Sequence, residues 1–117
     1  MPLFRRSDPA NKLAPCLNPG EELVTVLTMY WIPDAAGKSV PAFVGLTDRR
    51  LIVAEKLKPG GRHTLTLDLG QVVEIAGTTG RRPTLTLHTV GGLTVRFELV
   101  RRNADQAIRA AVAAART

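Results

Sequence analysis

The stretch AFVGLTDRRLIVAEKLK, residues 42–58, places two apolar runs on either side of the polar tetrapeptide Thr47-Asp48-Arg49-Arg50. The two runs contain Phe, Val and Ile, which favour the pleated and half-buried surface of a strand. Thr47 and Asp48 carry side-chain oxygens that accept hydrogen bonds from the backbone of a tight turn. The sequence therefore predicts a β-hairpin with its turn at residues 47–50.

Two adjacent arginines in that turn have two interpretations. They can keep the tip of the hairpin solvated, because charged side chains discourage pairing with other chains. They can also contact a polyanion such as a nucleic acid or an anionic membrane surface. The chain has 16 Lys and Arg residues against 10 Asp and Glu residues, a formal net charge of +6, which is compatible with both interpretations.

Alternation of apolar and polar residues predicts five further strands beside the two strands of this hairpin. Pro41 begins the hairpin's first strand, at a position that an edge or a bulge would tolerate. Gly91-Gly92 is typical of a tight hairpin turn, and the strand after it places Leu93, Val95, Phe97 and Leu99 on one face. The seven predicted strands are residues 22–31, 39–47, 49–57, 63–69, 71–77, 84–90 and 93–100.

The last segment changes to helical spacing. We predict a helix over residues 104–116, with Asn103 as its N-cap and Gln106 completing a capping box. A helix this short is marginal by itself, so it must dock on the sheet. Its small apolar stripe consists of Ala104, Ala107, Ile108, Ala111, Val112 and Ala115.

The first 20 residues contain four prolines, too many for a regular element. We interpret residues 1–20 as an extended arm and residues 21–117 as one domain, in keeping with the length of the chain. No apolar segment follows the first arginines as in a secretory signal, and no run is long enough to span a membrane. Cys16 is the single cysteine, so no intramolecular disulfide forms. We expect a cytoplasmic protein, with peripheral attachment to a membrane as a variant.

The order of seven strands and one C-terminal helix resembles the pleckstrin-homology-like (PH-like) superfold, and the hairpin is similar to that of its bacterial and GRAM-type members. In those domains a strand runs into an LT(D/N)(R/K)R turn, which residues 46–51 match here. The resemblance covers residues 20–116. It implies a mainly β fold, a seven-stranded antiparallel and partly open barrel or orthogonal sandwich with one C-terminal helix.

Two features depart from the resembled family. Its eukaryotic members carry a tryptophan in the C-terminal helix, whereas the single tryptophan here is Trp31, in the first strand. Members that bind phosphoinositides place several basic residues around the first loop, but this loop offers only Lys38 and also contains Asp34. The lipid-phosphate pocket therefore does not carry over.

The resemblance also implies a common location for several basic residues. It places the turn after the second strand, the loop after the fifth and the junction before the helix toward one end of the barrel. A candidate anion-binding or partner-binding patch there comprises Arg49, Arg50, Arg81, Arg82, Arg101 and Arg102. A candidate second basic site toward the opposite end comprises Lys38, Lys58 and Arg62.

Catalysis finds little support in the sequence. His63 and His88 lack a second ligand at metal-binding spacing, and Cys16 has no neighbouring base. Neither Ser7 nor Ser39 lies in a nucleophile elbow. We expect no enzyme activity, no metal and no cofactor.

Two adjacent aromatic residues are the candidate interface residues. Tyr30 and Trp31 point to opposite faces of a strand, so at most one of them is buried. The exposed one could anchor a partner. We treat the strand that carries them as an edge able to pair with another chain.

The sequence therefore predicts a non-catalytic interaction module whose partner is another protein or a second copy of itself. Binding of anionic membrane lipids through the arginine pairs is the alternative. Nucleic acid is a less favoured partner, because Phe43 and Phe97 are expected in the core and few aromatic residues remain to stack on bases.

Overall fold

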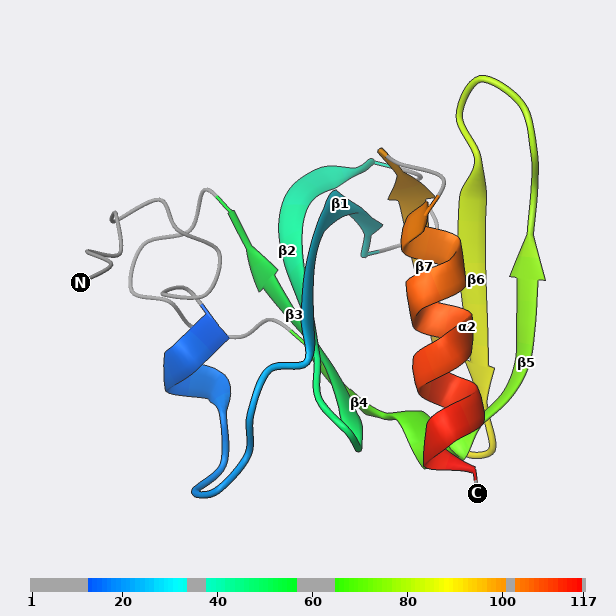
Figure 1. Cartoon of the computed structure of the whole chain (residues 1–117). Helices are drawn as coiled ribbons and strands as arrows, with labels where there is room; N and C mark the ends of the chain where they lie inside the picture. Colours follow the sequence, from blue (N-terminus) through cyan, green and yellow to red (C-terminus); the bar gives the residue numbers. More distant parts are fainter. Residues whose placement is uncertain (1–12, 34–37, 57–64, 101–102, 117) are drawn as a thin grey trace.

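The computed structural model describes residues 13–33, 38–56, 65–100 and 103–116, which form seven strands and a C-terminal helix (Figure 1). All strand pairs are antiparallel, and the sheet order is β4-β3-β2-β1-β7-β6-β5. The predicted number, order and type of elements are confirmed. Their bounds are β1 Thr25–Ile32, β2 Val40–Leu46, β3 Arg50–Glu55, β4 Leu65–Asp68, β5 Val72–Gly77, β6 Thr84–Thr89, β7 Thr94–Leu99 and α2 Asn103–Ala115, with short 3-10 turns η1 at Ala14–Cys16 and η3 at Leu69–Gln71.

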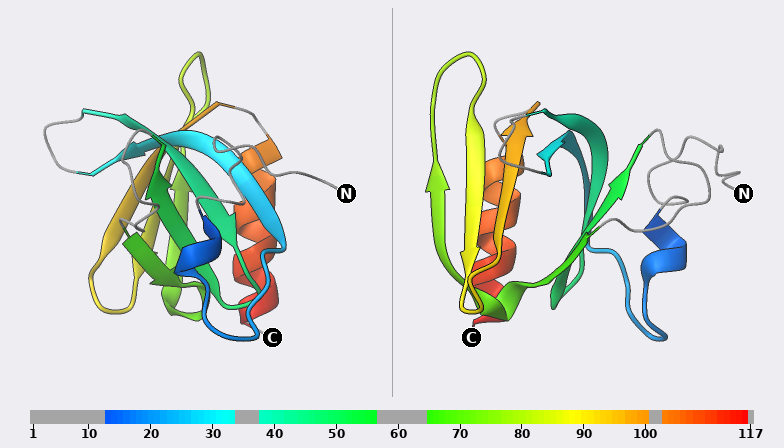
Figure 2. Two further views of the ribbon diagram at one scale, coloured as in Figure 1. Left: turned by 90° about the vertical axis from the view of Figure 1, so that its left-hand side faces the viewer. Right: turned by 180° about the vertical axis from the view of Figure 1, so that it is seen from behind.

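The sheet bends at β1 and is not closed. β1 pairs with β2 from Thr25 to Trp31 but with β7 only from Met29 to Ile32. Strands β1–β4 and β5–β7 therefore form two layers, and α2 lies across the open side between them (Figures 1 and 2). This arrangement gives both layers one shared interior.

That interior is built from the alternating faces predicted from the sequence. Each layer contributes leucine and valine side chains to one core cluster, to which the fully buried Phe97 also belongs. The helix closes the cluster, with Ala104, Ile108 and Val112 buried. Ala107, Ala111 and Ala115 pack against the same cluster, so the predicted apolar stripe of the helix is confirmed.

Three details of the sequence prediction are wrong. β2 lies between β1 and β3 and is therefore not an edge strand. Pro41 lies where the pairing of β2 with β3 ends, and its carbonyl accepts from the Lys56 N–H there. At the end of the ladder, the missing N–H of a proline costs little. β1 is also interior, and the edges of the described sheet are β4 and β5. Leu93 is 44% exposed, because the backbone and hydroxyl of Thr89 hold it in the β6–β7 turn.

The outer face of β2 and β3 is apolar too, and the end of the N-terminal arm covers it. Leu13 is fully buried against Phe43, Ile52 and Ala54. The arm was expected to lack regular elements, but residues 14–16 form η1, with Pro15 near its start where a missing N–H is tolerated. The described part of the arm is therefore a packed layer of the domain.

Within the residues that the structure describes, no helix has both the length and the apolar character needed to cross a membrane.

Candidate functional site

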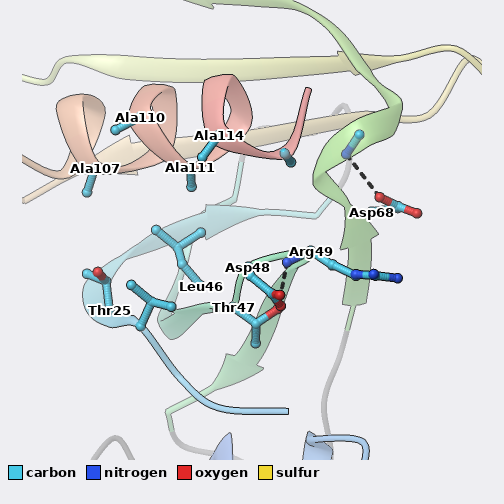
Figure 3. A pocket seen from close by; sticks show the side chains of 13 residues that line it. Thr25, Leu46, Thr47, Asp48, Arg49, Asp68, Ala107, Ala110, Ala111 and Ala114 are labelled. Carbon is cyan, nitrogen blue, oxygen red and sulfur yellow. Dashed lines mark hydrogen bonds between the residues drawn. The ribbon is translucent and has the colours of Figure 1, made fainter. Parts of the chain in front are cut away.

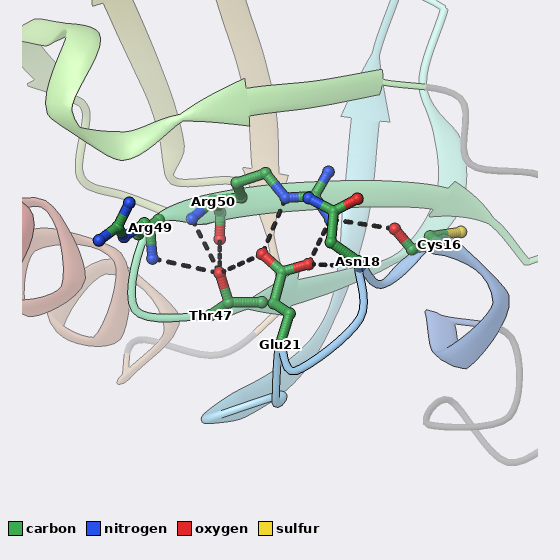
Figure 4. A network of polar contacts seen from close by, with 6 residues as sticks. All are labelled: Cys16, Asn18, Glu21, Thr47, Arg49 and Arg50. Carbon is green, nitrogen blue, oxygen red and sulfur yellow. Dashed lines mark hydrogen bonds and ion pairs between the residues drawn. The ribbon is translucent and has the colours of Figure 1, made fainter.

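The β2–β3 turn is held by a polar network centred on Thr47, which is buried (Figure 4). Its hydroxyl accepts from the backbone N–H groups of Arg49 at 3.2 Å and Arg50 at 2.9 Å. The same hydroxyl donates to Glu21 Oε2 at 3.1 Å. The turn chemistry predicted for Thr47 is thus present, and Thr47 also bonds Glu21, the residue that follows the arm.

Arg50 joins the arm to the hairpin. Its guanidinium forms a two-point ion pair with Glu21, with Nε to Oε2 at 2.8 Å and Nη2 to Oε1. Nη2 also donates to the Cys16 carbonyl at 3.0 Å. The two charged side chains are only 19% and 10% exposed. Arg50 is therefore engaged within the fold, and its neighbour Arg49 is the exposed arginine of this turn.

This pairing shifts both ionisation equilibria. Hydrogen bonds from Arg50 lower the pKa of Glu21 to about 2, against a desolvation that acts in the opposite direction. The Asn18 N–H and the Thr47 hydroxyl also bond the Glu21 carboxylate and favour its charged form. The same pair raises the pKa of Arg50. The network consequently stays ionised throughout the physiological range.

The candidate arginine patch is divided by the topology. The β2–β3 turn lies at the end of the molecule where α2 finishes, while the β5–β6 loop with Arg81 and Arg82 lies at the opposite end (Figure 1). The expected convergence of these two pairs is wrong, because β5 and its turn η3 span the distance between them. The Arg82 side chain is 83% exposed and lies 3.8 Å from Glu98. Arg101 and Arg102 lie outside the described residues.

The second candidate basic site is described only in part. Lys38 is exposed in the β1–β2 connection. Lys58 and Arg62 lie outside the described residues, as does His63. His88 is half-buried on β6 and lies 3.3 Å from the Thr94 hydroxyl, from Nδ1 to Oγ1. Within the described ranges, no three His, Cys, Asp or Glu side chains gather as a metal site.

The adjacent aromatic residues behave as strand geometry requires. Trp31 packs against the core cluster, and Tyr30 is 41% exposed on the opposite face. Tyr30 pairs with Glu98 on β7 and with Pro41 on β2, so it lies within the sheet rather than at its edge. Both predicted core aromatics, Phe43 and Phe97, are buried.

A groove of about 780 Å³ lies between α2 and the end of the molecule that carries the β2–β3 turn (Figure 3). One wall is the helix, where a row of alanine side chains faces the opening. The other wall is the start of β1 and the end of β2. The lining residues are Val24, Thr25, Leu46, Thr47, Asp48, Arg49, Asp68, Gly70, Ala107, Ala110, Ala111, Ala114 and Ala115.

The groove is apolar along the helix and charged at one end. Val24 is 72% exposed on its rim, and Ala110 and Ala114 are exposed on its helical wall. Asp48, Arg49 and Asp68 lie toward the C-terminal end of α2 (Figure 3). One Asp68 oxygen, Oδ1, accepts from the Gly70 N–H at 2.9 Å, which starts the turn η3.

Sequence reasoning missed both Glu21 and this groove. Glu21 is 29 residues from Arg50, and no local pattern connects the two. The groove had one sequence signal, since Ala110, Ala113 and Ala114 occupy helical positions that solvent-facing helices usually fill with charged residues.

Comparison with solved structures decides the fold. A C-terminal domain of an unknown protein from Leishmania infantum superposes with a TM-score of 0.66 at 14% identity, over 92% of this chain and 94% of that one. The PH domain of human oxysterol-binding protein-related protein 11 superposes with a TM-score of 0.63 at 11% identity, over 85% of each chain. The chain has the PH-like fold.

A third similarity concerns a larger protein. The linker-DH/PH fragment of p115-RhoGEF superposes with a TM-score of 0.66 at 15% identity, over 97% of this chain but only 35% of that fragment. The sequence itself matches no protein-family model and no curated protein. At these identities the PH-like domains are similar to this one in fold alone.

Proposed function

We propose that this PH-like domain is a non-catalytic module that binds another protein in the groove between α2 and the β2–β3 turn. The observation that carries the proposal is the groove itself, a concave and largely apolar surface of about 780 Å³ beside an uncharged helix face. Concave apolar surfaces with a few polar groups at one end are the usual form of a binding site.

Two further observations support this location. The alanine side chains form a low wall, so a ligand backbone can approach the helix closely. The Thr47 network fixes the opposite rim, because Thr47 lines the groove and is bonded to Glu21, the residue that follows the arm. A rim that is ordered before binding costs little conformational entropy on association.

A capture experiment with two matched variants tests the proposal. Ala110→Trp fills the groove, whereas Ala113→Trp adds the same side chain to an exposed position of α2 that does not line it. Proteins captured from a lysate of the source cells by the parent and by Ala113→Trp should be lost with Ala110→Trp. Capture that is equal for all three chains would place the binding surface elsewhere.

Anionic membrane is a second candidate partner, supported by the exposed Arg81 and Arg82 on the projecting β5–β6 loop (Figure 1). Each basic residue near an anionic surface contributes about 1 kcal/mol. Vesicles with anionic lipid should bind the parent at about 20 mM salt and release it at physiological salt. Arg81→Glu with Arg82→Glu should abolish this binding and leave the melting temperature unchanged, because neither side chain lies in the core. An unbound parent at low salt would refute this candidate.

A further inference from the structure

The backbone of β1 is only partly used by the sheet. On one side it pairs with β2 along Thr25–Trp31, but on the other side the β7 ladder begins at Met29. Among the described strands, Thr25–Thr28 therefore have no partner on the side where α2 lies. Thr25 and the preceding Val24 line the groove, so the open part of this edge begins inside it. An extended segment satisfies such an edge by main-chain hydrogen bonds, as in β-strand addition.

The length of the groove agrees with a short segment. The alanine wall runs from Ala107 to Ala115, a rise of eight residues along the helix axis, which is about 12 Å. An extended chain covers that length with about four residues. Every second side chain of such a segment would face the alanines, where the shallow wall accepts apolar groups of small or medium size.

The charged end of the groove is net negative in a chain whose formal net charge is +6. Asp48 and Asp68 are both exposed there, and Arg49 is the single basic lining residue. Arg49 extends away from the alanine side chains (Figure 3). The last turn of α2 carries no basic residue, and Arg116, which follows it directly, donates through Nη2 to the Val72 carbonyl and does not line the groove. This end therefore complements a cation on the bound segment.

We propose that the groove binds an extended peptide segment of about four residues that pairs with the open edge of β1 and places a Lys or Arg between Asp48 and Asp68. The inference rests on the proposed function and names the chemistry of the partner. Apolar side chains of the segment contact Val24, Leu46 and the alanine wall. Main-chain pairing supplies affinity, and the cation sets the direction in which the segment lies.

Selection from a random 12-residue phage-display library against the full chain tests this proposal. Phage that also bind Ala110→Trp are removed first, so the peptides that remain depend on the groove. We expect them to share alternating apolar positions followed by a Lys or Arg. A selected peptide should lose about tenfold in affinity for Ala110→Trp and retain it for Ala113→Trp.

A second pair of variants tests the cation. Asp48→Asn with Asp68→Asn should weaken the selected peptide by about threefold to tenfold and should leave its Lys-to-Gln version unaffected. Amide signals of Thr25 and Val26 should shift on binding, since they belong to the paired edge. Groove-dependent peptides that lack a basic residue, or that bind without shifts on β1, would overturn this inference while leaving the proposed function intact.

Two other outcomes would refute the proposed function or identify a different occupant of the groove. If no peptide distinguishes Ala110→Trp from the parent, the proposed function fails together with the inference. If the parent is a dimer that Ala110→Trp converts to a monomer, the occupant is a second copy of the chain and the peptide proposal is wrong.

Discussion

Gly45→Ala tests whether the N-terminal arm belongs to the folded domain. Gly45 is buried in the middle of β2, and a Cβ added to it would lie 2.7 Å from Leu23 Cδ2 and 3.0 Å from Leu13 Cδ1. Both distances are shorter than a normal contact, so the two leucines must move. Forcing one extra methyl into a packed site costs about 1–3 kcal/mol.

The sign of the effect depends on Leu13 of the arm and on Leu23, which follows the arm. In a strand whose outer face is free, alanine is more stable than glycine by about 0.5–1 kcal/mol, because glycine loses more backbone entropy on folding. Leu13→Ala should itself cost about 2–5 kcal/mol, since Leu13 is fully buried. The double variant should be less destabilised than the sum, with a coupling of about 0.5–3 kcal/mol, because Leu13→Ala removes one of the two side chains that the new methyl meets, while the contact with Leu23 remains.

Urea unfolding of the four chains gives these free energies, with the fluorescence of Trp31 as one probe and circular dichroism as another. Gly91→Ala is the control, because Gly91 is exposed and a Cβ there would meet no atom within 4 Å. Effects of Gly45→Ala and Leu13→Ala that simply add in the double variant would show that the arm does not pack on β2 at Gly45.

Three further perturbations test the ion pair, the helix and the sheet edge. Glu21→Gln should destabilise the domain by about 1–3 kcal/mol at neutral pH. Because folding lowers the pKa of Glu21 from its ordinary 4.5 to about 2, the parent should lose this stabilisation as the pH falls through that interval. A Glu21→Gln chain with the same acid unfolding profile as the parent would contradict this ion pair. Val112→Asp should cost about 2–4 kcal/mol or prevent folding, because it buries an unpaired carboxylate. Ala113→Asp, on the exposed face of α2, should be nearly neutral. Equal melting temperatures for the two variants would mean that α2 does not dock as described. Self-association through a sheet edge should use β5, where Val73 is 53% exposed. Light scattering should then report a mass above that of the monomer, and Val73→Lys should reduce this mass. A parent chain that is monomeric at high micromolar concentration would exclude association through this edge.

Arg49 and Arg50 show which contacts neighbouring residues predict and which they do not. Thr47 and the residues after it predict a tight turn correctly, because the bonds that make it are three residues apart or fewer. The same stretch does not reveal that Arg50 binds Glu21 across 29 residues while Arg49 remains exposed. Adjacent residues of one type thus have different environments, since Arg49 lies in the turn and Arg50 is the first residue of β3.

The sequence by itself determined the elements and their apolar faces, because the spacing of apolar residues in strands and helices is a property of neighbouring residues. It predicted seven strands, one docked helix and the residues of its buried stripe. Only the tertiary structure decided that β1 and β2 are interior, that the arm covers a second apolar face, and that the arginine pairs of two turns lie at opposite ends. The groove also exists only in three dimensions, since α2 and the β2–β3 turn are far apart in sequence and meet because the bent sheet leaves one side open for the helix to cover.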